Sequence, residues 1–256
     1  MSCDRYSDLW SPYFAAFFDH WSDCPFPVYL LANEREFQHP RVTTLRSGPD
    51  LDWSSSLIAG LGLFPHRHVL TLFEDLFFLH KIETARVTDL CNWAAVNAAS
   101  YLRMKASPPP DEPTSRPDVG RVHESALYRT ALHGALTERQ YLVGLIRPGE
   151  SAWHFEIFSP GRAAADSRFY STFEDIFRTT NGVEKGLWYP DVLRTLRERG
   201  YITGNVTRGA WSPQQVANRA RLAAMRGLIR DLLPRSLRPL FHRALWRWYR
   251  LTGKVR

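Results

Sequence analysis

Cysteine is scarce in this sequence of 256 residues, and its three cysteines, Cys3, Cys24 and Cys91, are far apart and form no CxxC pair. The pattern gives no disulfide framework and suits a reducing compartment. No apolar run approaches the roughly 20 residues that span a bilayer. The first residues, MSCDRYSDLW, lack the basic and apolar regions of a signal peptide. We expect a cytoplasmic protein, at most peripheral on the inner face of the cell membrane.

Two further patterns are missing. No glycine-rich phosphate loop stands near the start, which disfavours a nucleotidyltransferase, and no HExxH motif is present. His66, His68 and His80 have no cysteine partner at zinc-ligand spacing, so we expect structural or surface roles for them. No internal repeat is visible.

Positive charge is concentrated at one end of the chain. The formal net charge is +7, but residues 208–256 hold 12 Lys and Arg against one acid, Asp231, a local charge of +11. Residues 1–207 carry a charge of −4. We therefore divide the chain into a main domain, 1–207, and a basic helical tail, 208–256, whose charge favours an anionic partner.

Strand-like and helix-like segments alternate along the main domain. Strands are predicted at 27–33, 41–48, 68–75 and 101–106, and helices at 9–20, 53–63, 82–99, 136–146 and 189–200. Asp52 or Ser54 would cap the second helix, and Gly200 would end the last. The Pro-rich segment 107–118 is expected to be a surface loop. The alternation predicts an α/β domain with a mostly parallel sheet and flanking helices.

Two adjacent carboxylates close an apolar run. In HVLTLFED (68–75), Glu74 and Asp75 stand where a buried strand should end. Ligands of open α/β sheets bind beyond the carboxyl ends of the strands, where a carboxylate can hold a divalent cation on nucleotide phosphates. Alternatively, Asp75 caps a helix or pairs with an arginine. The pair alone does not decide between these interpretations.

A third acid lies in SAWHFE (151–156), which combines Trp153, His154 and Glu156 after a glycine. An indole ring can pack on the C–H face of a sugar, and a carboxylate in a partly apolar site can act as a general base because its pKa is raised. The alternative is a core tryptophan beside a surface glutamate.

These stretches resemble a bacterial family of glycosyltransferases with the GT-A fold, associated with surface polysaccharide synthesis. The resemblance covers about the first 160 residues, and the matching stretches follow in order. They are SCDRYSDLW (2–10), HWSDCPFPVYLLAN (20–33), DWSSSL (52–57), HVLTLFEDLFFL (68–79), YLRM (101–104) and SAWHFE (151–156).

The resemblance implies a GT-A-like, Rossmann-like sheet with a nucleotide-sugar over its strand ends. It places Glu74 and Asp75 at the family's DxD motif, although this sequence reads E-D-L, with no second Asp two residues on. Asp75 would hold a divalent cation, Mn²⁺ or Mg²⁺, or the pair would contact the donor without metal. SAWHFE is similar to the WGxED-type motif of inverting members, which maps the catalytic base onto Glu156 and acceptor binding onto Trp153 and His154.

By the same resemblance, the donor nucleotide contacts the first loop and a few later positions. The residues of the first loop are Ser2, Asp4 and Tyr6. The resemblance also assigns donor binding to Trp53, Ser54 and Arg103. The family has a strand before the SCD stretch, whereas this sequence starts at Met1. We expect either a start upstream of the recorded one, with an apolar run of about 5 or 6 residues, or a sheet without that strand.

The implied reaction is single-displacement transfer of a sugar from a nucleotide-sugar to a glycan acceptor, which is lipid-linked if the tail binds membrane. Glu156 would take the acceptor proton, and a metal at Asp75, or Lys81 or Arg103, would offset the charge of the departing diphosphate. Two alternatives stay open: nucleotidyl transfer, and a membrane-recruited, non-catalytic scaffold with a degenerate transferase fold.

The tail is predicted to form two amphipathic basic helices, at 213–233 and 236–252. Such helices bind anionic membrane surfaces through an apolar face and a rim of arginines. We expect the first helix to pack on the main domain and the second to meet membrane. Nucleic acid is disfavoured as a partner because the tail has no recognised nucleic-acid-binding motif.

Overall fold

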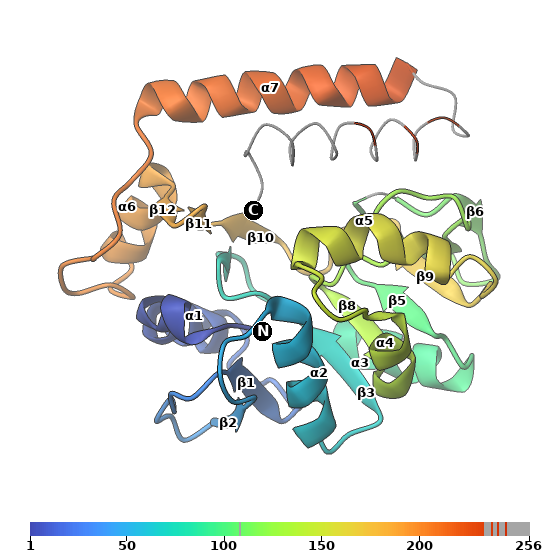
Figure 1. Ribbon diagram of the computed structural model, residues 1–256, viewed down its shortest axis with the longest axis horizontal. Helices are drawn as coiled ribbons and strands as arrows, with labels where there is room; N and C mark the ends of the chain where they lie inside the picture. The colour runs from blue at the N-terminus through green and yellow to red at the C-terminus, as the bar shows by residue number, and fades with distance from the viewer. Residues whose placement is uncertain (108, 233–236, 238–239, 241–243, 245–256) are drawn as a thin grey trace.

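The computed structural model describes residues 1–107 and 109–232, together with Leu237, Leu240 and Ala244 (Figure 1). The helices are η1 (Asp4–Leu9, a 3-10 helix), α1 (Trp10–His20), α2 (Trp53–Leu63), α3 (Thr84–Val96), α4 (Arg139–Leu145), α5 (Ala152–Arg162), α6 (Pro190–Glu198) and α7 (Pro213–Leu232). The strands are β1 (Val28–Ala32), β2 (Val42–Arg46), β3 (His68–Thr71), β4 (Leu76–Phe78), β5 (Tyr101–Arg103), β6 (Glu112–Pro113), β7 (Val119–Arg121), β8 (Ala135–Glu138), β9 (Phe169–Thr172), β10 (Thr179–Asn181), β11 (Val183–Glu184) and β12 (Leu187–Trp188).

The largest sheet has six strands in the order β3-β8-β5-β9-β7-β6. Only β5 and β9 pair in parallel in it, and its other neighbours are antiparallel. Three two-stranded sheets accompany it: β1 with β2 in parallel, and β4 with β10 and β11 with β12 antiparallel. The protein is therefore a mixed α/β structure.

The prediction of a mostly parallel sheet is wrong, and β8 is the main reason. Its last three residues, Leu-Thr-Glu, begin the stretch 136–146 that we predicted as one helix, because Leu and Glu favour helices. In the structure they form a strand that runs between β3 and β5 in the opposite direction, and the helix, α4, begins only at Arg139. Pairing with two neighbours outweighs the local helix preference.

Helices cover both faces of the sheet, and the two sides form separate core clusters. Alternate strand residues point to opposite sides, so Tyr101 joins one cluster and Leu102 the other. The first core cluster unites the sheet with α1, α3 and α6, and the second unites it with α2, α4 and α5. The result is a three-layer α/β/α arrangement.

Other predicted elements are close to those observed. The helix predicted at 53–63 is α2, and its N-cap, Asp52, accepts a hydrogen bond from the amide of Ser55 at 2.9 Å. Gly200 follows α6 with a φ of 75°, the left-handed conformation that ends helices readily. The strand predicted at 68–75 is shorter than expected, because β3 ends at Thr71 and leaves the acidic pair in a turn.

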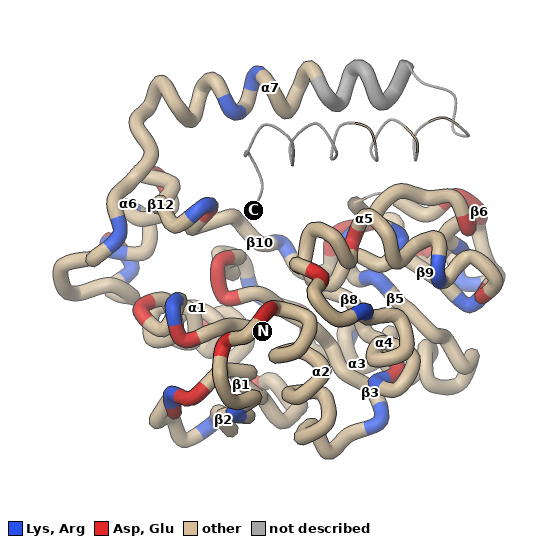
Figure 2. Tube along the Cα trace, viewed as in Figure 1, with Lys and Arg blue, Asp and Glu red and all other residues tan. Residues whose placement is uncertain are grey.

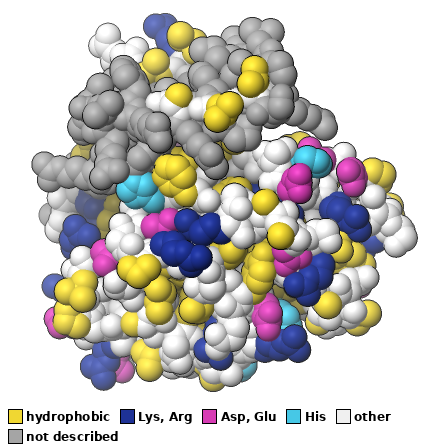
Figure 3. Space-filling view, turned by 45° about the vertical axis from the view of Figure 1, so that its right-hand side comes forward, with side chains coloured by type: hydrophobic (Ala, Val, Ile, Leu, Met, Phe, Trp, Pro, Cys, Tyr) yellow, Lys and Arg dark blue, Asp and Glu magenta, His cyan; other side chains and the backbone are white. Residues whose placement is uncertain are grey.

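Beyond α6, helix α7 extends apart from the sheet (Figure 1). Leu222 and Met225 on this helix are exposed, at 48% and 57%, and basic residues mark its described part in Figure 2. On the face drawn in Figure 3, acidic and basic side chains are interspersed over the body. The second predicted tail helix, 236–252, lies almost entirely outside the described residues. No described helix is long and apolar enough to cross a membrane.

Candidate functional site

The carboxyl ends of several strands meet at one edge of the fold. Strands β3 and β5 are both antiparallel to β8, and β9 is parallel to β5, so these three share one direction. Strand β1 joins them, because Leu31 near its end and Leu72 just after β3 accept hydrogen bonds from the adjacent residues Ser2 and Met1. Such an edge is where open α/β sheets bind ligands.

The acidic pair occupies this edge, in the turn between β3 and β4. Burial raises the pKa of Glu74 to about 7. The Met1 ammonium opposes this shift, and the neighbouring Asp75 adds to it. Burial likewise raises the pKa of Asp75 to about 6, while a backbone hydrogen bond and the ammonium oppose the shift. The Asp75 carbonyl accepts a hydrogen bond from Gly182 at 2.7 Å, which ties the turn to the segment after β10. Both carboxyls thus titrate near neutral pH.

The N-terminal segment lies beside this turn. The Ser2 hydroxyl accepts a hydrogen bond from the Trp10 indole at 2.7 Å and interacts with Glu74, whose pKa it lowers. The Tyr6 ring lies under the guanidinium of Arg208, 4.3 Å from its centroid, and burial raises the pKa of Tyr6. Among the residues predicted to bind the donor nucleotide, Ser2 therefore contacts the acidic pair.

Asp4 is engaged with the loop that follows β1. Its Oδ1 accepts from the amide of Asn33 at 3.0 Å, and its Oδ2 accepts from the amides of Glu34 and Arg35, both at 3.0 Å. In return, the Asp4 amide donates to Asn33 Oδ1 at 3.1 Å. Asp4 thus fixes the loop at the carboxyl end of β1, which is a structural role at the same edge.

Trp53 and Ser54 stand at the start of α2 and face α5. The Ser54 hydroxyl donates to Asp52 at 2.5 Å and accepts from the Glu150 amide at 3.2 Å. The Trp53 ring packs on Phe155 with centroids 5.7 Å apart. No contact in the described chain joins these two residues to the acidic pair. Their contacts instead hold α2 against α5.

Arg103 and Glu156 form a second buried charged region. Arg103 is 2% exposed, and its Nη2 donates to the Ser107 carbonyl, while Nε and Nη1 have no partner within the described chain. Glu156 accepts from the Leu132 amide at 3.1 Å. Burial raises the pKa of Glu156, and the Leu132 hydrogen bond and Arg103 oppose the shift. The structure therefore gives Glu156 a raised pKa and a cationic neighbour.

Trp153 and His154 lie in the first turn of α5, three and two residues before Glu156. The helix begins with a capping box, in which the Ser151 hydroxyl accepts from the His154 amide at 3.3 Å and the His154 ring accepts from the Ser151 amide. Trp153 is 55% exposed. Trp153 and Glu156 are three residues apart, so the accessible indole ring and the partly buried carboxylate lie on one side of the helix.

One further residue at this edge, His133, was not predicted from the sequence. His133 is buried, and its Nδ1 accepts from the Phe73 amide at 3.3 Å, so Nε2 carries the proton and donates to Thr179 Oγ1 at 3.0 Å. Burial lowers the pKa of His133 to about 3, so the ring is neutral. Its neighbour Gly134 has a φ of 69°, and the His-Gly pair was the signal in the sequence for an unusual turn.

The segment 130–134 separates the two acidic regions. His133 packs on Phe73, next to the acidic turn, and Leu132 binds Glu156. No hydrogen bond or ion pair joins Asp75 to Glu156 in the described chain. A cavity of about 450 Å³ touches Glu74 and Met1 but neither Asp75 nor Glu156. No group of three or more metal-ligating side chains occurs in the part of the chain that the structure describes.

Comparison with known proteins adds no relative, since no family model, no curated protein and no solved structure matches this chain.

Proposed function

We propose that this protein is a glycosyltransferase that moves a sugar from a nucleotide-sugar donor to a glycan acceptor. The observation that carries the proposal is the pair of desolvated carboxylates, with raised pKa values, at the edge where the strands end. Carboxyls with perturbed pKa values concentrate at functional sites. The resemblance in the sequence assigns the same two residues to the donor diphosphate.

Glu74 and Asp75 fit a divalent cation in number and in charge. Mg²⁺ or Mn²⁺ in nucleotide enzymes is commonly held by one or two carboxylates, with phosphates and water completing the shell. A cation would also return both carboxyls to the ionised form that burial disfavours. When bound, such a metal would offset the charge of the nucleotide diphosphate that leaves.

Glu156 is the proposed base for the acceptor hydroxyl, and transfer would invert the anomeric carbon. Burial raises its pKa, which makes the carboxylate a stronger base. The exposed ring of Trp153, one turn away, offers a flat apolar surface for a sugar, with His154 beside it. This arrangement requires donor and acceptor to meet across the segment 130–134.

The basic tail supports a lipid-linked acceptor at an anionic membrane surface. The described part of α7 exposes Leu222 and Met225 beside arginines. An exposed apolar face with a basic rim is the pattern of a helix that lies on a membrane. We propose residues 213–252 as this surface, which would keep the enzyme peripheral to the membrane on its cytoplasmic side.

A specific observation favours a second candidate, the non-catalytic scaffold. Asp4 uses both carboxylate oxygens to hold the loop after β1, and Glu156 and Asp75 are on opposite sides of the segment 130–134. A degenerate transferase fold that only recruits partners to the membrane would have the same features.

Binding of nucleotides separates the two candidates. We expect a saturating nucleoside diphosphate with Mn²⁺ to raise the melting temperature by roughly 5–10 °C, since a ligand at 100 times its Kd adds about 2.7 kcal/mol. Asp75→Asn should remove most of this shift, whereas the matched variant Asp23→Asn, at an exposed position, should keep it. The absence of a shift across a panel of nucleoside diphosphates, with and without Mn²⁺, would contradict the transferase and favour the scaffold.

A further inference from the structure

Strands β1 and β3 face each other across a groove, and neither has a strand partner on that side among the described residues. Strand β1 pairs with β2 alone, and β3 pairs with β8 alone. Backbone N–H and C=O groups are obligatory hydrogen-bonding groups, so an interior strand edge without a partner strand calls for an explanation.

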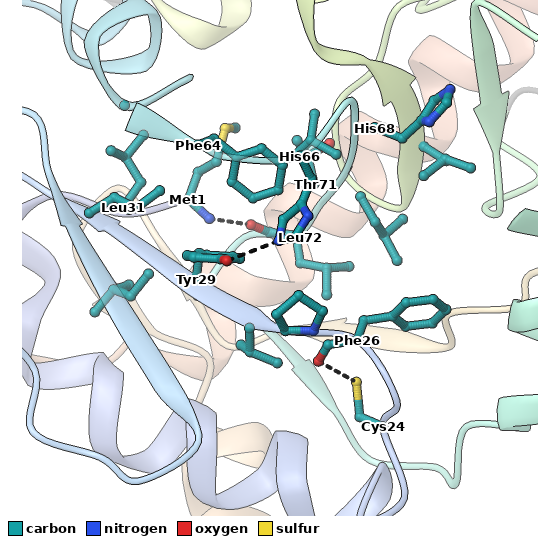
Figure 4. A pocket seen from close by; sticks show the side chains of 18 of the residues that line it. Met1, Cys24, Phe26, Tyr29, Leu31, Phe64, His66, His68, Thr71 and Leu72 are labelled. Atoms are coloured by element: carbon teal, nitrogen blue, oxygen red, sulfur yellow. Dashed lines mark hydrogen bonds between the residues drawn. The ribbon is translucent and has the colours of Figure 1, made fainter. Parts of the chain in front are cut away.

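Residues 1 and 2 are the only part of the described chain that bonds to both strands across this groove. The Ser2 amide donates to the Leu31 carbonyl of β1 at 3.1 Å, and the Met1 amine donates to the Leu72 carbonyl after β3. Figure 4 shows Met1 between Leu31 and Leu72, with its bond to Leu72 dashed. Because both carbonyls are near the carboxyl ends of their strands, residues 1 and 2 occupy only that end of the groove.

The rest of the groove is an apolar cavity of about 450 Å³. Its lining includes Leu31 and Leu70 from the two strands, Leu57 and Leu61 from α2, and Tyr13 and Phe17 from α1. It therefore has helices on both sides and strand edges at its flanks, which are the surroundings of an interior strand of a three-layer fold.

The two strands already lie in the same layers of the molecule. In β1, Leu30 belongs to the first core cluster and Leu31 packs on the second; in β3, Leu70 packs on the first and Val69 belongs to the second. A strand between them would therefore place alternate side chains against α1 and against α2. Both sets of positions are apolar, as is usual for an interior parallel strand.

The hydrogen bonds fix which groups of β1 point into the groove. Peptide groups alternate in direction along a strand, so residues two apart face the same neighbour. The Ala32 carbonyl accepts from Ser47 on the β2 side, and the Leu31 carbonyl accepts from Ser2 on the other. Tyr29 and Leu31 therefore direct their amides into the groove.

The same reasoning applies to β3. The Thr71 carbonyl accepts from Gly134 on the β8 side at 2.8 Å, whereas the Leu72 carbonyl accepts from Met1. Leu70, two residues before Leu72, therefore directs its amide into the groove, and Val69 faces β8.

We propose that this groove takes one more β-strand, an apolar segment of roughly four to six residues that runs parallel to β1 and β3 and enters residue 1 through a peptide bond. The strand would join the β1–β2 sheet to the six-stranded sheet and form one continuous sheet. This inference concerns the fold and does not depend on the proposed function.

The surroundings of Met1 support covalent continuity over a separate peptide. The Met1 ammonium is buried, and this burial lowers its pKa, although Glu74 and Asp75 oppose the shift. A peptide amide at the same place would still donate to the Leu72 carbonyl without carrying a buried charge, which desolvation disfavours. If a separate peptide occupied the groove, the Met1 ammonium would stay buried next to the carboxyl end of that peptide.

The test is a pair of extensions of roughly six residues at the N-terminus of the full chain. One is rich in Val and Ile, and the matched control has the same length with proline at two alternate positions, which removes amide donors and is incompatible with an interior strand. We expect the first extension to raise the melting temperature by roughly 5–10 °C. Amide exchange should slow at least about tenfold at Tyr29, Leu31 and Leu70, and should not slow preferentially at Leu30 and Val69.

Three results would overturn the proposal. One is equal exchange at Tyr29, Leu31 and Leu70 in the apolar extension and its proline control. Another is an apolar extension that abolishes the cooperative melt. The third is protection from the free apolar peptide added to the unextended chain with none from the fusion, which would assign the groove to a separate partner.

Discussion

Glu74 and Asp75 are acids kept in a partly buried turn, with an ammonium and a serine hydroxyl as their neighbours. Burial raises both pKa values above those of an unfolded chain, so the folded state holds its protons to higher pH. Stability from these groups is therefore fully present below about pH 4 and is lost as the pH rises towards 7. Ionisation of these two carboxyls near neutral pH therefore destabilises the folded protein. Such a cost is expected where charged groups are kept in order to bind a ligand.

We predict that Glu74→Gln raises the free energy of unfolding at pH 8 by roughly 1–3 kcal/mol, because it removes the carboxylate whose ionisation burial disfavours. Near pH 4 the gain should be small, since Glu74 is protonated in the folded protein. Urea unfolding at the two pH values measures this, with the exposed variant Glu36→Gln as the control. A gain that is the same at both pH values would show that the carboxylate is not desolvated.

Glu156→Gln tests the proposed base. The amide keeps the size of the side chain and still accepts from Leu132, but it cannot take a proton. Transfer should fall by roughly 10²–10⁴-fold, while nucleotide-induced stabilisation is retained. Glu138→Gln, at the end of β8, is a control that should leave transfer unchanged. Full transfer by Glu156→Gln would remove this residue from the mechanism.

At the scale of elements, the pairing of β4 with β10 closes the acidic turn. Gly182 follows β10, and its amide bonds to the Asp75 carbonyl. A Cβ at Gly182 would lie 2.4 Å from the Phe77 ring and 3.4 Å from that carbonyl. The close approach of the two segments therefore depends on glycine at this position.

Gly182→Ala should lower the free energy of unfolding by roughly 1–3 kcal/mol, because Phe77 is fully buried and can move little. Gly62→Ala in α2 is the matched control: a Cβ there meets nothing within 4 Å, and alanine should stabilise the helix by about 0.5–1 kcal/mol. Chemical denaturation measures both. Equal effects of the two substitutions would show that the turn is not tightly packed.

Several elements were predictable from sequence because their residues carry the information locally. Helix α1 has a regular apolar face, and α2 follows the cap residue Asp52. Strand β8 was not predictable, since Ala-Leu-Thr-Glu favours a helix until β3 and β5 flank it. His133 was missed for a similar reason: its role depends on Phe73 and Thr179, which are 60 residues before it and 46 residues after it in the chain.

At the scale of the whole molecule, charge and exposed apolar surface coincide on the C-terminal helix. Leu222 and Met225 are exposed on α7, and arginines stand beside them. Near the start of this helix, Arg219 contacts Glu184 and Trp211, whereas Leu222 and Met225 farther along are exposed.

We predict that the protein sediments with vesicles containing phosphatidylglycerol and not with neutral phosphatidylcholine vesicles, because arginines attract anionic headgroups. Leu222→Ser combined with Met225→Ser should weaken binding several-fold by removing buried apolar area. A matched control, Gln214→Ser with Asn218→Ser, alters exposed polar positions of the same helix. Equal binding by all variants would assign any membrane affinity to another part of the molecule.

The β1–β2 sheet and the six-stranded sheet are joined by few main-chain hydrogen bonds, so the boundary between them should resist force weakly. Among the described strands no ladder crosses it, and main-chain support comes from residues 1 and 2. Native proteins open first where few hydrogen bonds resist separation. The β1–β2 sheet should therefore detach as a unit before the larger sheet melts, and pulling the chain apart under force should show this step as an early, separate rupture.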